Sequence, residues 1–271
     1  LSTRPKAATV GVGRQVILRP SIQKRFLKLT EPSLEDQRTD LQRIMDEIND
    51  IELKTDLLVL RKIPQVLRSN NFEVTAVIAD EELIDIEVGD TTKNKYGVAF
   101  DLGTTTVVAT LMDLNTGTPV SVKSMLNKQQ PFGADVISRI SATMLDKDSL
   151  EKLCKLAKDT LFELTEQVIL ESKIDRNYIY EIAIAGNATM IQLVLNIDPE
   201  PIGVAPFITV SKDFPELKAS DFGVVINENA KAYVFPSFGA YVGGDIVSGV
   251  LASGIDRDKS CLLYTSPSPR D

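Results

Sequence analysis

Short apolar runs separated by polar turns predict a β-rich stretch over residues 96–126. The runs "YGVAFD", "TVVATLMDL" and "TPVSVKSML" are rich in β-branched and aromatic residues, which is typical of strands. Asn115, Thr116 and Gly117 separate the second run from the third and carry a hairpin-turn signal. The pattern therefore predicts three consecutive strands joined by tight turns.

Helical periodicity replaces this pattern further along the chain. "GADVISRISATML" predicts a helix, and a longer one follows, for which Asp148 with Glu151 matches a capping box. Its apolar stripe consists of Leu150, Leu153, Cys154, Ala157, Leu161, Leu164 and Val168. "IYEIAIAG" and "KAYVFPSF" predict two more strands, and the helices "NATMIQLVL" and "GGDIVSGVLASG" follow them, the second with Gly254 in the C-capping position. The second part of the chain is therefore expected to be α/β.

The first part of the chain predicts a smaller α/β unit. "RQVILRP" predicts a short strand, and "EPSLED" predicts a helix start with Ser33 as the cap. The residues that follow on one helical face are Leu41, Ile44, Met45 and Ile48. "DLLVL" predicts a strand, "IPQVLRSNN" a short helix, and "FEVTAVIAD" with "LIDIEVGD" a hairpin. We expect a linker over residues 1–30, a small α/β domain over 31–92, and a second domain from residue 96 after the polar stretch "TTKNK".

The amino-acid composition limits the kinds of ligand and of catalytic group that this chain can use. The net charge is −8, and residues 96–271 hold 15 basic and 22 acidic residues, which argues against nucleic-acid binding. A phosphate handled by this acidic part would be bound by backbone amides or a metal ion. The chain has no histidine, so Ser-His-Asp triads and histidine bases are excluded. Two cysteines and the lack of an 18-residue apolar run favour a cytoplasmic protein with no membrane span.

The turn Asp101-Leu102-Gly103-Thr104-Thr105-Thr106 joins two predicted buried strands. Glycine allows close backbone approach, the amides of Gly103 to Thr106 can point into one concavity, and the hydroxyls add donors. Asp101 is placed to hold Mg²⁺, which would offset its repulsion of phosphate. The sequence predicts a phosphate cradle here, and a plain hairpin with a polar turn is the alternative.

Three further stretches place polar groups where a helix begins. They are Asp135 after Gly133, Gly186 with Asn187, and the glycine pair Gly243 and Gly244 with Asp245. Helix N-termini at the carboxyl ends of strands suit anionic ligands. Asp245 is equally well explained as a helix cap. Asp135 is a candidate for function because Arg139 lies four positions on, and a surface ion pair between the two is the alternative.

These strings together resemble one family. The hairpin "YGVAFDLGTTTVVATLMDLNTG" is similar to the first phosphate motif of the actin, sugar-kinase and Hsp70 superfamily. "GADVISRI", "AGNATMIQLVLNIDPEPIGVAPF" and "FPSFGAYVGGDIVSGVLASG" resemble the reductive activators of corrinoid-dependent enzymes. The resemblance covers about residues 14–260. It implies a small α/β middle domain followed by the first half of an actin-like, ribonuclease H-like ATPase domain.

The resemblance also implies a function. Such proteins use ATP and Mg²⁺ to drive an electron from a [2Fe-2S] domain to a Co(II) corrinoid, which is returned to Co(I). The expected partners are a corrinoid protein or a corrinoid-dependent methyltransferase and an electron donor. By position, Asp101 would serve Mg²⁺, and Gly103, Thr104, Thr105 and Thr106 would hold phosphates. Asp135 would be the catalytic residue, while Gly186, Asn187, Gly244 and Asp245 would line the cleft.

The sequence departs from that family at both ends. No cysteine set for an iron–sulfur cluster is present, so the cluster is expected only in a missing N-terminal domain. The first ATPase subdomain is expected over 96–260. Over 261–271, "CLLYTSPSPRD" breaks a strand with prolines and is expected to be a non-native tail. The chain is therefore expected to be a fragment, inactive alone. The alternatives are a small-molecule kinase of the same superfamily and an ATP-switched binding module without enzymatic activity.

Overall fold

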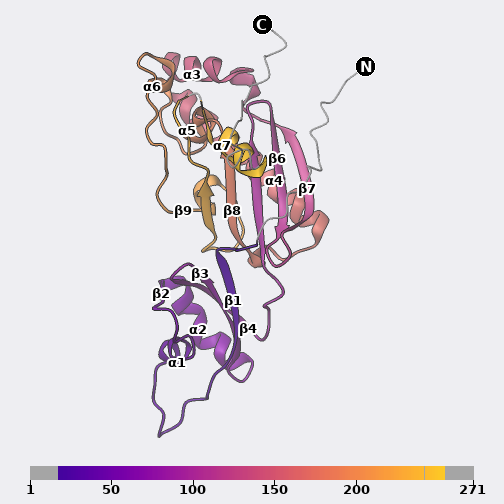
Figure 1. The fold of residues 1–271 in the computed structure, drawn as a ribbon, viewed down its shortest axis with the longest axis vertical. Helices are drawn as coiled ribbons and strands as arrows, with labels where there is room; N and C mark the ends of the chain where they lie inside the picture. The colour runs from indigo at the N-terminus through magenta and orange to yellow at the C-terminus, as the bar shows by residue number, and fades with distance from the viewer. Residues whose placement is uncertain (1–17, 241, 254–271) are drawn as a thin grey trace.

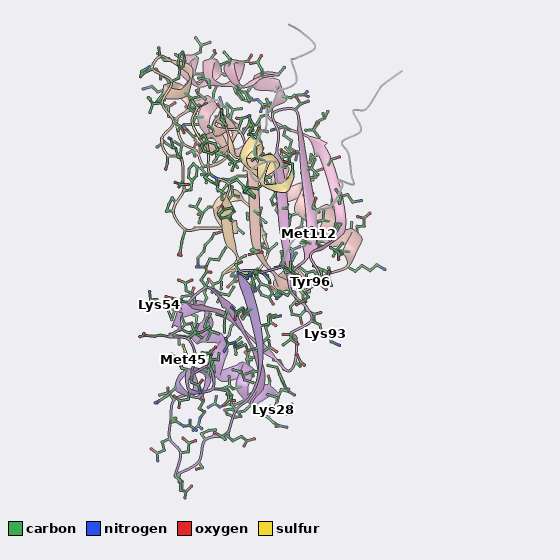
Figure 2. All side chains as sticks on the ribbon, viewed as in Figure 1. Lys28, Met45, Lys54, Lys93, Tyr96 and Met112 are labelled. Atoms are coloured by element: carbon green, nitrogen blue, oxygen red, sulfur yellow. The ribbon has the colours of Figure 1, made fainter. Side chains whose placement is uncertain are left out.

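Two β-sheets organise the chain in a computed structural model, which describes residues 18–240 and 242–253 (Figure 1). The first sheet has the order β1-β3-β4-β2 and contains β1 (Ile22–Lys28), β2 (Lys54–Thr55), β3 (Glu73–Ala79) and β4 (Glu82–Val88). The second has the order β7-β6-β5-β8-β10-β9 and contains β5 (Tyr96–Leu102), β6 (Thr106–Asp113), β7 (Thr118–Leu126), β8 (Ile179–Gly186), β9 (Leu217–Lys218) and β10 (Lys231–Val234). Lys93 and Tyr96 mark the passage from one sheet to the other (Figure 2).

The first sheet packs against α1 (Asp40–Glu47) and α2 (Leu57–Ser69). The expected helix start near Ser33 is wrong, because Thr39 caps α1 by accepting a hydrogen bond from the Gln42 N–H at 3.1 Å. Ser33 instead closes a local turn, in which its hydroxyl accepts from the Asp36 N–H at 3.1 Å. The predicted apolar face of α1 is confirmed, since Ile44 and Ile48 are buried and Leu41 and Met45 pack against the same core.

The strand expected over 56–60 is wrong, because these residues open α2. Asp56 caps the helix by accepting from the Val59 N–H at 3.1 Å. Val59, Ile63 and Leu67 lie at four-residue spacing and are all buried, so one helical face spans both predicted elements. A short apolar run cannot be assigned to strand or helix by periodicity alone.

The second sheet confirms the predicted meander of β5, β6 and β7. Val98, Phe100 and Leu102 point to one face of β5 and are buried beside Leu161 and Leu164 of α4 (Asp148–Ser172). The expected capping box at Asp148 is wrong, because Asp148 is the first helical residue. Asp146 accepts from the Asp148 N–H at 3.1 Å in its place.

The carboxyl ends of three parallel strands meet at one edge of this sheet. β8 runs parallel to β5 and to β10, and Leu102 lies opposite Gly186. The remaining helices are α3 (Val136–Leu145), α5 (Ala188–Val194), α6 (Glu200–Gly203) and α7 (Gly244–Ser253). α5 starts directly after β8, and α7 contacts β8 in front of the sheet, whereas α4 lies behind it (Figure 1). This edge is where ligands bind in open α/β sheets.

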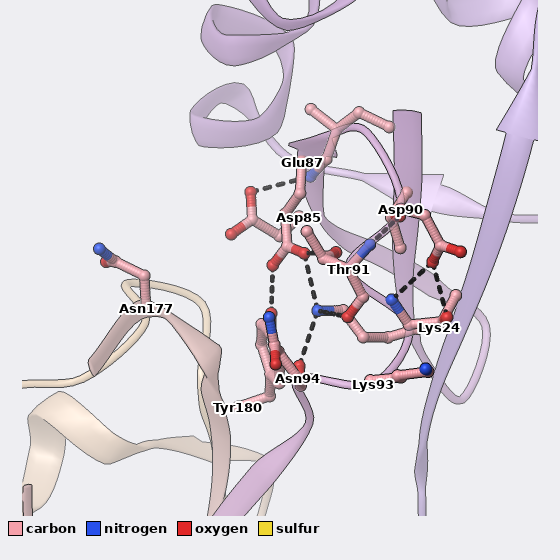
Figure 3. A network of polar contacts seen from close by, with 12 residues as sticks. Lys24, Asp85, Glu87, Asp90, Thr91, Lys93, Asn94, Asn177 and Tyr180 are labelled. Carbon is pink, nitrogen blue, oxygen red and sulfur yellow. Dashed lines mark hydrogen bonds and ion pairs between the residues drawn. The ribbon is translucent and has the colours of Figure 1, made fainter. Parts of the chain in front are cut away.

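A polar seam joins the two sheets (Figure 3). The Lys24 ammonium pairs with Glu87 at 2.7 Å and lies 4.9 Å from the ring centroids of both Tyr178 and Tyr180. The Tyr180 hydroxyl donates to the Glu87 carboxylate. Burial and the adjacent Glu87 charge raise the pKa of Tyr180 well above its usual range, so the hydroxyl keeps its proton and remains a donor.

A second set of contacts in the seam centres on Asp85 of β4. Its buried carboxylate accepts from the Lys62 ammonium at 3.0 Å and from the Asn227 side-chain amide at 2.6 Å. Asn229 donates to the Ile84 carbonyl at 3.0 Å. Because these bonds join residues far apart in the sequence, the loop before β10 holds the first sheet against the second.

The domain boundaries stay a prediction. β1 pairs with β3, so residues 22–28 belong to the first sheet although a linker is expected over 1–30. Residues 261–271, Gly254 and most of the strand expected over 14–20 lie outside the described residues. Within the described ranges, no helix has both the length and the apolar character needed to cross a bilayer.

Replacing Asn227 by alanine is expected to lower the free energy of unfolding by about 1–3 kcal/mol, because it removes the 2.6 Å donor to Oδ2 of the buried Asp85 carboxylate and leaves that oxygen only the Lys62 ammonium at 3.2 Å. Chemical denaturation measures the change. Asn177→Ala is the matched control, since its side chain is exposed and its backbone carbonyl, which also accepts from Asn227, is kept. Equal stability of the two variants would show that the seam contributes little.

Candidate functional site

The turn between β5 and β6 contains a row of free donors. Within the described part of the chain, no protein group accepts from the backbone N–H groups of Gly103, Thr104 and Thr105. A Cβ atom at Gly103 would lie 2.4 Å from the Thr106 carbonyl oxygen. Glycine is therefore required by the turn itself, rather than only by a ligand. Consecutive free amides of this kind suit the oxygens of an anion.

Asp101 stands next to this turn, on the face of β5 opposite the buried side chains. Its side chain is exposed, whereas Phe100 and Leu102 are buried. Partial desolvation raises the pKa of Asp101, and the nearby Asp245 charge raises it further. Two carboxylates that repel each other at a sheet edge are an arrangement that a divalent cation would stabilise.

Asn187 ties the second stretch to the turn. It caps α5 by accepting from the Met190 N–H at 2.9 Å, and its amide donates to the Thr104 hydroxyl at 3.2 Å. Gly186 lies beneath it, where a Cβ atom would be 3.2 Å from the Leu102 carbonyl oxygen. The structure therefore brings together the two stretches that the sequence predicted separately.

The third stretch packs directly on the second. A Cβ atom at Gly243 would lie 2.4 Å from Asn187 Cα, and one at Gly244 would lie 2.6 Å from the Phe235 carbonyl oxygen. These approaches bring the start of α7, with the exposed Asp245, to the same edge. The Asp245 carboxylate accepts from the Ile246 N–H at 2.9 Å.

Asp135 is not joined to these groups by any hydrogen bond among the described residues. It caps α3, where its carboxylate accepts from the Ser138 N–H at 2.7 Å. Hydrogen bonds from Ser138 hold the pKa of Asp135 below its usual value, so the group is charged at neutral pH. The alternative reading, a surface ion pair between Asp135 and Arg139, is absent from the described contacts, because Arg139 is fully buried and donates to the Thr104 carbonyl.

The sequence did not single out the polar residues that support the turn from below. Asn127 donates its side-chain amide to the Gly103 carbonyl at 3.0 Å, and its backbone N–H donates to Thr105 at 2.9 Å. Gln129 and Arg139 are also fully buried. The available signal is "LNKQQPFGADVISRI", the stretch from the end of β7 into α3, in which the polar residues Asn127, Gln129 and Arg139 are far more buried than such residue types usually are.

In the described residues, no group of three histidine, cysteine, aspartate or glutamate side chains gathers as a metal site. A cation at Asp101 would therefore complete its shell with phosphate oxygens and water, as Mg²⁺ usually does. The free amides, the threonine hydroxyls and one exposed carboxylate fit Mg²⁺ and a polyphosphate. They do not fit an iron–sulfur cluster, because Cys154 is buried and bonded to the Val194 carbonyl.

Comparisons with known proteins find relatives for most of the chain. Residues 11–93 match the model of the RACo linker region, and residues 96–258 match that of the RACo middle region. The corrinoid activation enzyme RamQ of Eubacterium limosum is 36% identical over 226 residues, which cover 77% of this chain and 38% of RamQ. The solved structure of a reductive activator for corrinoid, iron-sulfur protein matches with a TM-score of 0.83 and 34% identity, over 92% of this chain and 41% of that one.

The chain thus spans about two fifths of the length of these relatives. The structural match confirms the expected α/β class and the actin-like ATPase type of fold. The assignments of individual site residues stay predictions. Because the middle-region model alone covers more than half of the sequence, the chain belongs to the RACo family, whose matched members include activators of corrinoid proteins.

Proposed function

We propose that this chain is part of an ATP-dependent reductive activator that returns the Co(II) form of a corrinoid cofactor to Co(I). The observation that carries the proposal is the row of free amides at Gly103, Thr104 and Thr105, beside the Asp101 carboxylate, at the carboxyl edge of the sheet. The names of its relatives supply the corrinoid part of the proposal, which is extended from RamQ and the reductive activator to this chain.

Each site residue has a proposed task. Asp101 holds Mg²⁺, directly or through water, while the amides and hydroxyls of residues 103–106 bind the terminal phosphates of ATP. Gly186, Asn187, Gly244 and Asp245 line the nucleotide cleft. Asp135 positions the metal or the attacking water, a role for which its low pKa keeps it charged.

The electron comes from outside this sequence. Reduction of Co(II) to Co(I) takes one electron. A [2Fe-2S] cluster that an external donor has reduced would supply this electron and would itself be reoxidised. Two cysteines cannot ligate such a cluster, so its ligands would lie on another segment or protein. The proposed partners are a corrinoid protein or a corrinoid-dependent methyltransferase and an electron donor, all in the cytoplasm. Hydrolysis of ATP to ADP and phosphate provides the free energy.

The test uses the full-length protein with Mg-ATP, a reductant and a Co(II) corrinoid protein. We expect Mg-ATP to shift the NMR signals of the Gly103, Thr104 and Thr105 amides, and Co(I) to appear in the absorption spectrum only when ATP is hydrolysed. ATP turnover that requires a small hydroxylated substrate, and no corrinoid protein, would instead identify a kinase of the same superfamily.

A further inference from the structure

We propose that Arg139 is a positioning residue, which holds the phosphate turn at residues 103–106 in its anion-binding shape from behind. The inference rests on the proposed function, because it takes the ligand of the turn to be a polyphosphate. It assigns a task to a side chain that is fully buried and that the sequence indicated only as a neighbour of Asp135.

The guanidinium group reaches four acceptors in the described structure. It donates through Nη2 to the Thr104 carbonyl at 2.6 Å and through Nε to the Gly133 carbonyl at 3.1 Å. Through Nη1 it donates to Gln129 Oε1 at 2.9 Å and to Met190 Sδ at 3.1 Å. A planar group with its donors fixed in this way holds the Thr104 carbonyl in one orientation.

The orientation of that carbonyl determines where a free amide points. In a trans peptide the C=O and the following N–H point in opposite directions. The Thr104 carbonyl faces Arg139, so the Thr105 N–H faces away from it. Asn127 acts on the two neighbouring peptides, because it donates to the Gly103 and Thr105 carbonyls at 3.0 and 2.9 Å.

Asn127 and Arg139 are linked through Gln129 and bind the turn from the same side. The Gln129 N–H donates to Asn127 Oδ1 at 3.0 Å, and Gln129 Oε1 accepts from Arg139 at 2.9 Å. The Gly103 and Thr104 carbonyls are therefore held by connected buried side chains, and the Thr105 carbonyl is held by the backbone N–H of Asn127. The free N–H groups of Thr104 and Thr105 belong to the first two of these peptides and are turned to the opposite side, where a phosphate would bind.

The charge of Arg139 favours the same ligand. Its four acceptors are neutral, and within the described residues it forms no ion pair. Desolvation lowers its pKa to about 10, with Asp135 acting in the opposite direction, so the group is still charged at pH 7. A buried cation that forms no ion pair is costly, and an anion bound in front of the turn would offset that cost.

The test compares Arg139→Gln with Arg139→Lys in the full-length protein, and uses calorimetry with Mg-ATP and with adenosine. We expect Arg139→Gln to weaken Mg-ATP binding about 10-fold or more while adenosine binding is unchanged. Arg139→Lys keeps the charge but loses the fixed fork of donors, so we expect a smaller loss. The NMR signal of the Thr105 amide should shift in both variants without any ligand, because its peptide is no longer held in one orientation.

Arg43→Gln is the matched control. Arg43 is also a buried arginine that donates to backbone carbonyls, but it lies in the first sheet's unit and binds Asp36 and Thr30. We expect it to lower the melting temperature and leave Mg-ATP affinity unchanged.

Three results would overturn the inference. Binding of Mg-ATP by Arg139→Gln as tightly as by the wild type would refute the role of Arg139 and leave the proposed function in place. Equal losses for Mg-ATP and adenosine would show a general structural role instead. If the wild type binds no Mg-ATP at all, the proposed function fails, and the inference fails with it.

Discussion

Asp101→Asn is expected to weaken Mg²⁺-dependent ATP binding by on the order of 100-fold and to abolish ATP-driven corrinoid reduction in the full-length protein. The substitution keeps the shape of the side chain and removes the negative charge that would hold the cation. The fold should be unaffected, because the side chain is exposed and its neighbours Phe100 and Leu102 supply the buried contacts of β5. We expect the free energy of unfolding to change by no more than about 0.5 kcal/mol.

Calorimetry with ATP, at several Mg²⁺ concentrations, measures the effect. Asp159→Asn is the control, since Asp159 pairs with Lys155 on the surface of α4 and lies outside the site. Nucleotide binding that stays as strong and as Mg²⁺-dependent in Asp101→Asn as in the wild type would remove Asp101 from the metal site.

Gly103→Ala is expected to distort the phosphate turn. The added Cβ atom would lie 2.4 Å from the Thr106 carbonyl oxygen, a backbone atom that cannot move without shifting β6. We expect a loss of about 1–3 kcal/mol in the free energy of unfolding, together with at least about 10-fold weaker binding of Mg-ATP. Valine at this position should have a larger effect because its β-branch adds bulk at the same point.

Gly239→Ala provides the comparison, because a Cβ atom there would meet nothing within 4 Å. Thermal unfolding and calorimetry on the two variants separate a loss of stability from a loss of affinity. If Gly103→Ala binds Mg-ATP like Gly239→Ala, the turn does not form the phosphate site.

The sequence was most informative where a single period extended over a whole element. The apolar stripe of α4 keeps one helical period over about five turns, and β5, β6 and β7 are short runs rich in β-branched and aromatic residues between clear turn residues, so these elements were predicted correctly. The run at 56–60 is too short to show a period, and its helix depends on contacts of Ile63 and Leu67 with the first sheet. Local capping rules also misplaced the start of α1, because two suitable polar residues, Ser33 and Thr39, lie close together.

For the site, the sequence predicted which segments meet at the edge of the sheet. It did not predict the buried side chains that bind the carbonyls of the turn between β5 and β6. Glycines and acids after strands predict a shared edge, and the structure places Gly103, Gly186 and Asp245 there. The roles of Asn127 and Arg139 depend on which carbonyl each side chain meets. That information is set by the path of the chain between β7 and α3, which no local pattern encodes.

The position of β1 determines where a segment that precedes the described chain would be attached. Ile22 begins β1 and is fully buried, its carbonyl accepts from the Lys95 ammonium at 3.2 Å, and Ser21 donates to Glu181 of β8. The described chain thus enters at the junction of the two sheets, rather than at the far end of the first (Figure 1). An electron-carrying domain attached ahead of Leu18 would be tethered at this junction. The distance that this domain could cover toward a docked cofactor would then depend on the length of the tether alone. The first sheet would add nothing to that distance, because the tether does not start from its far end.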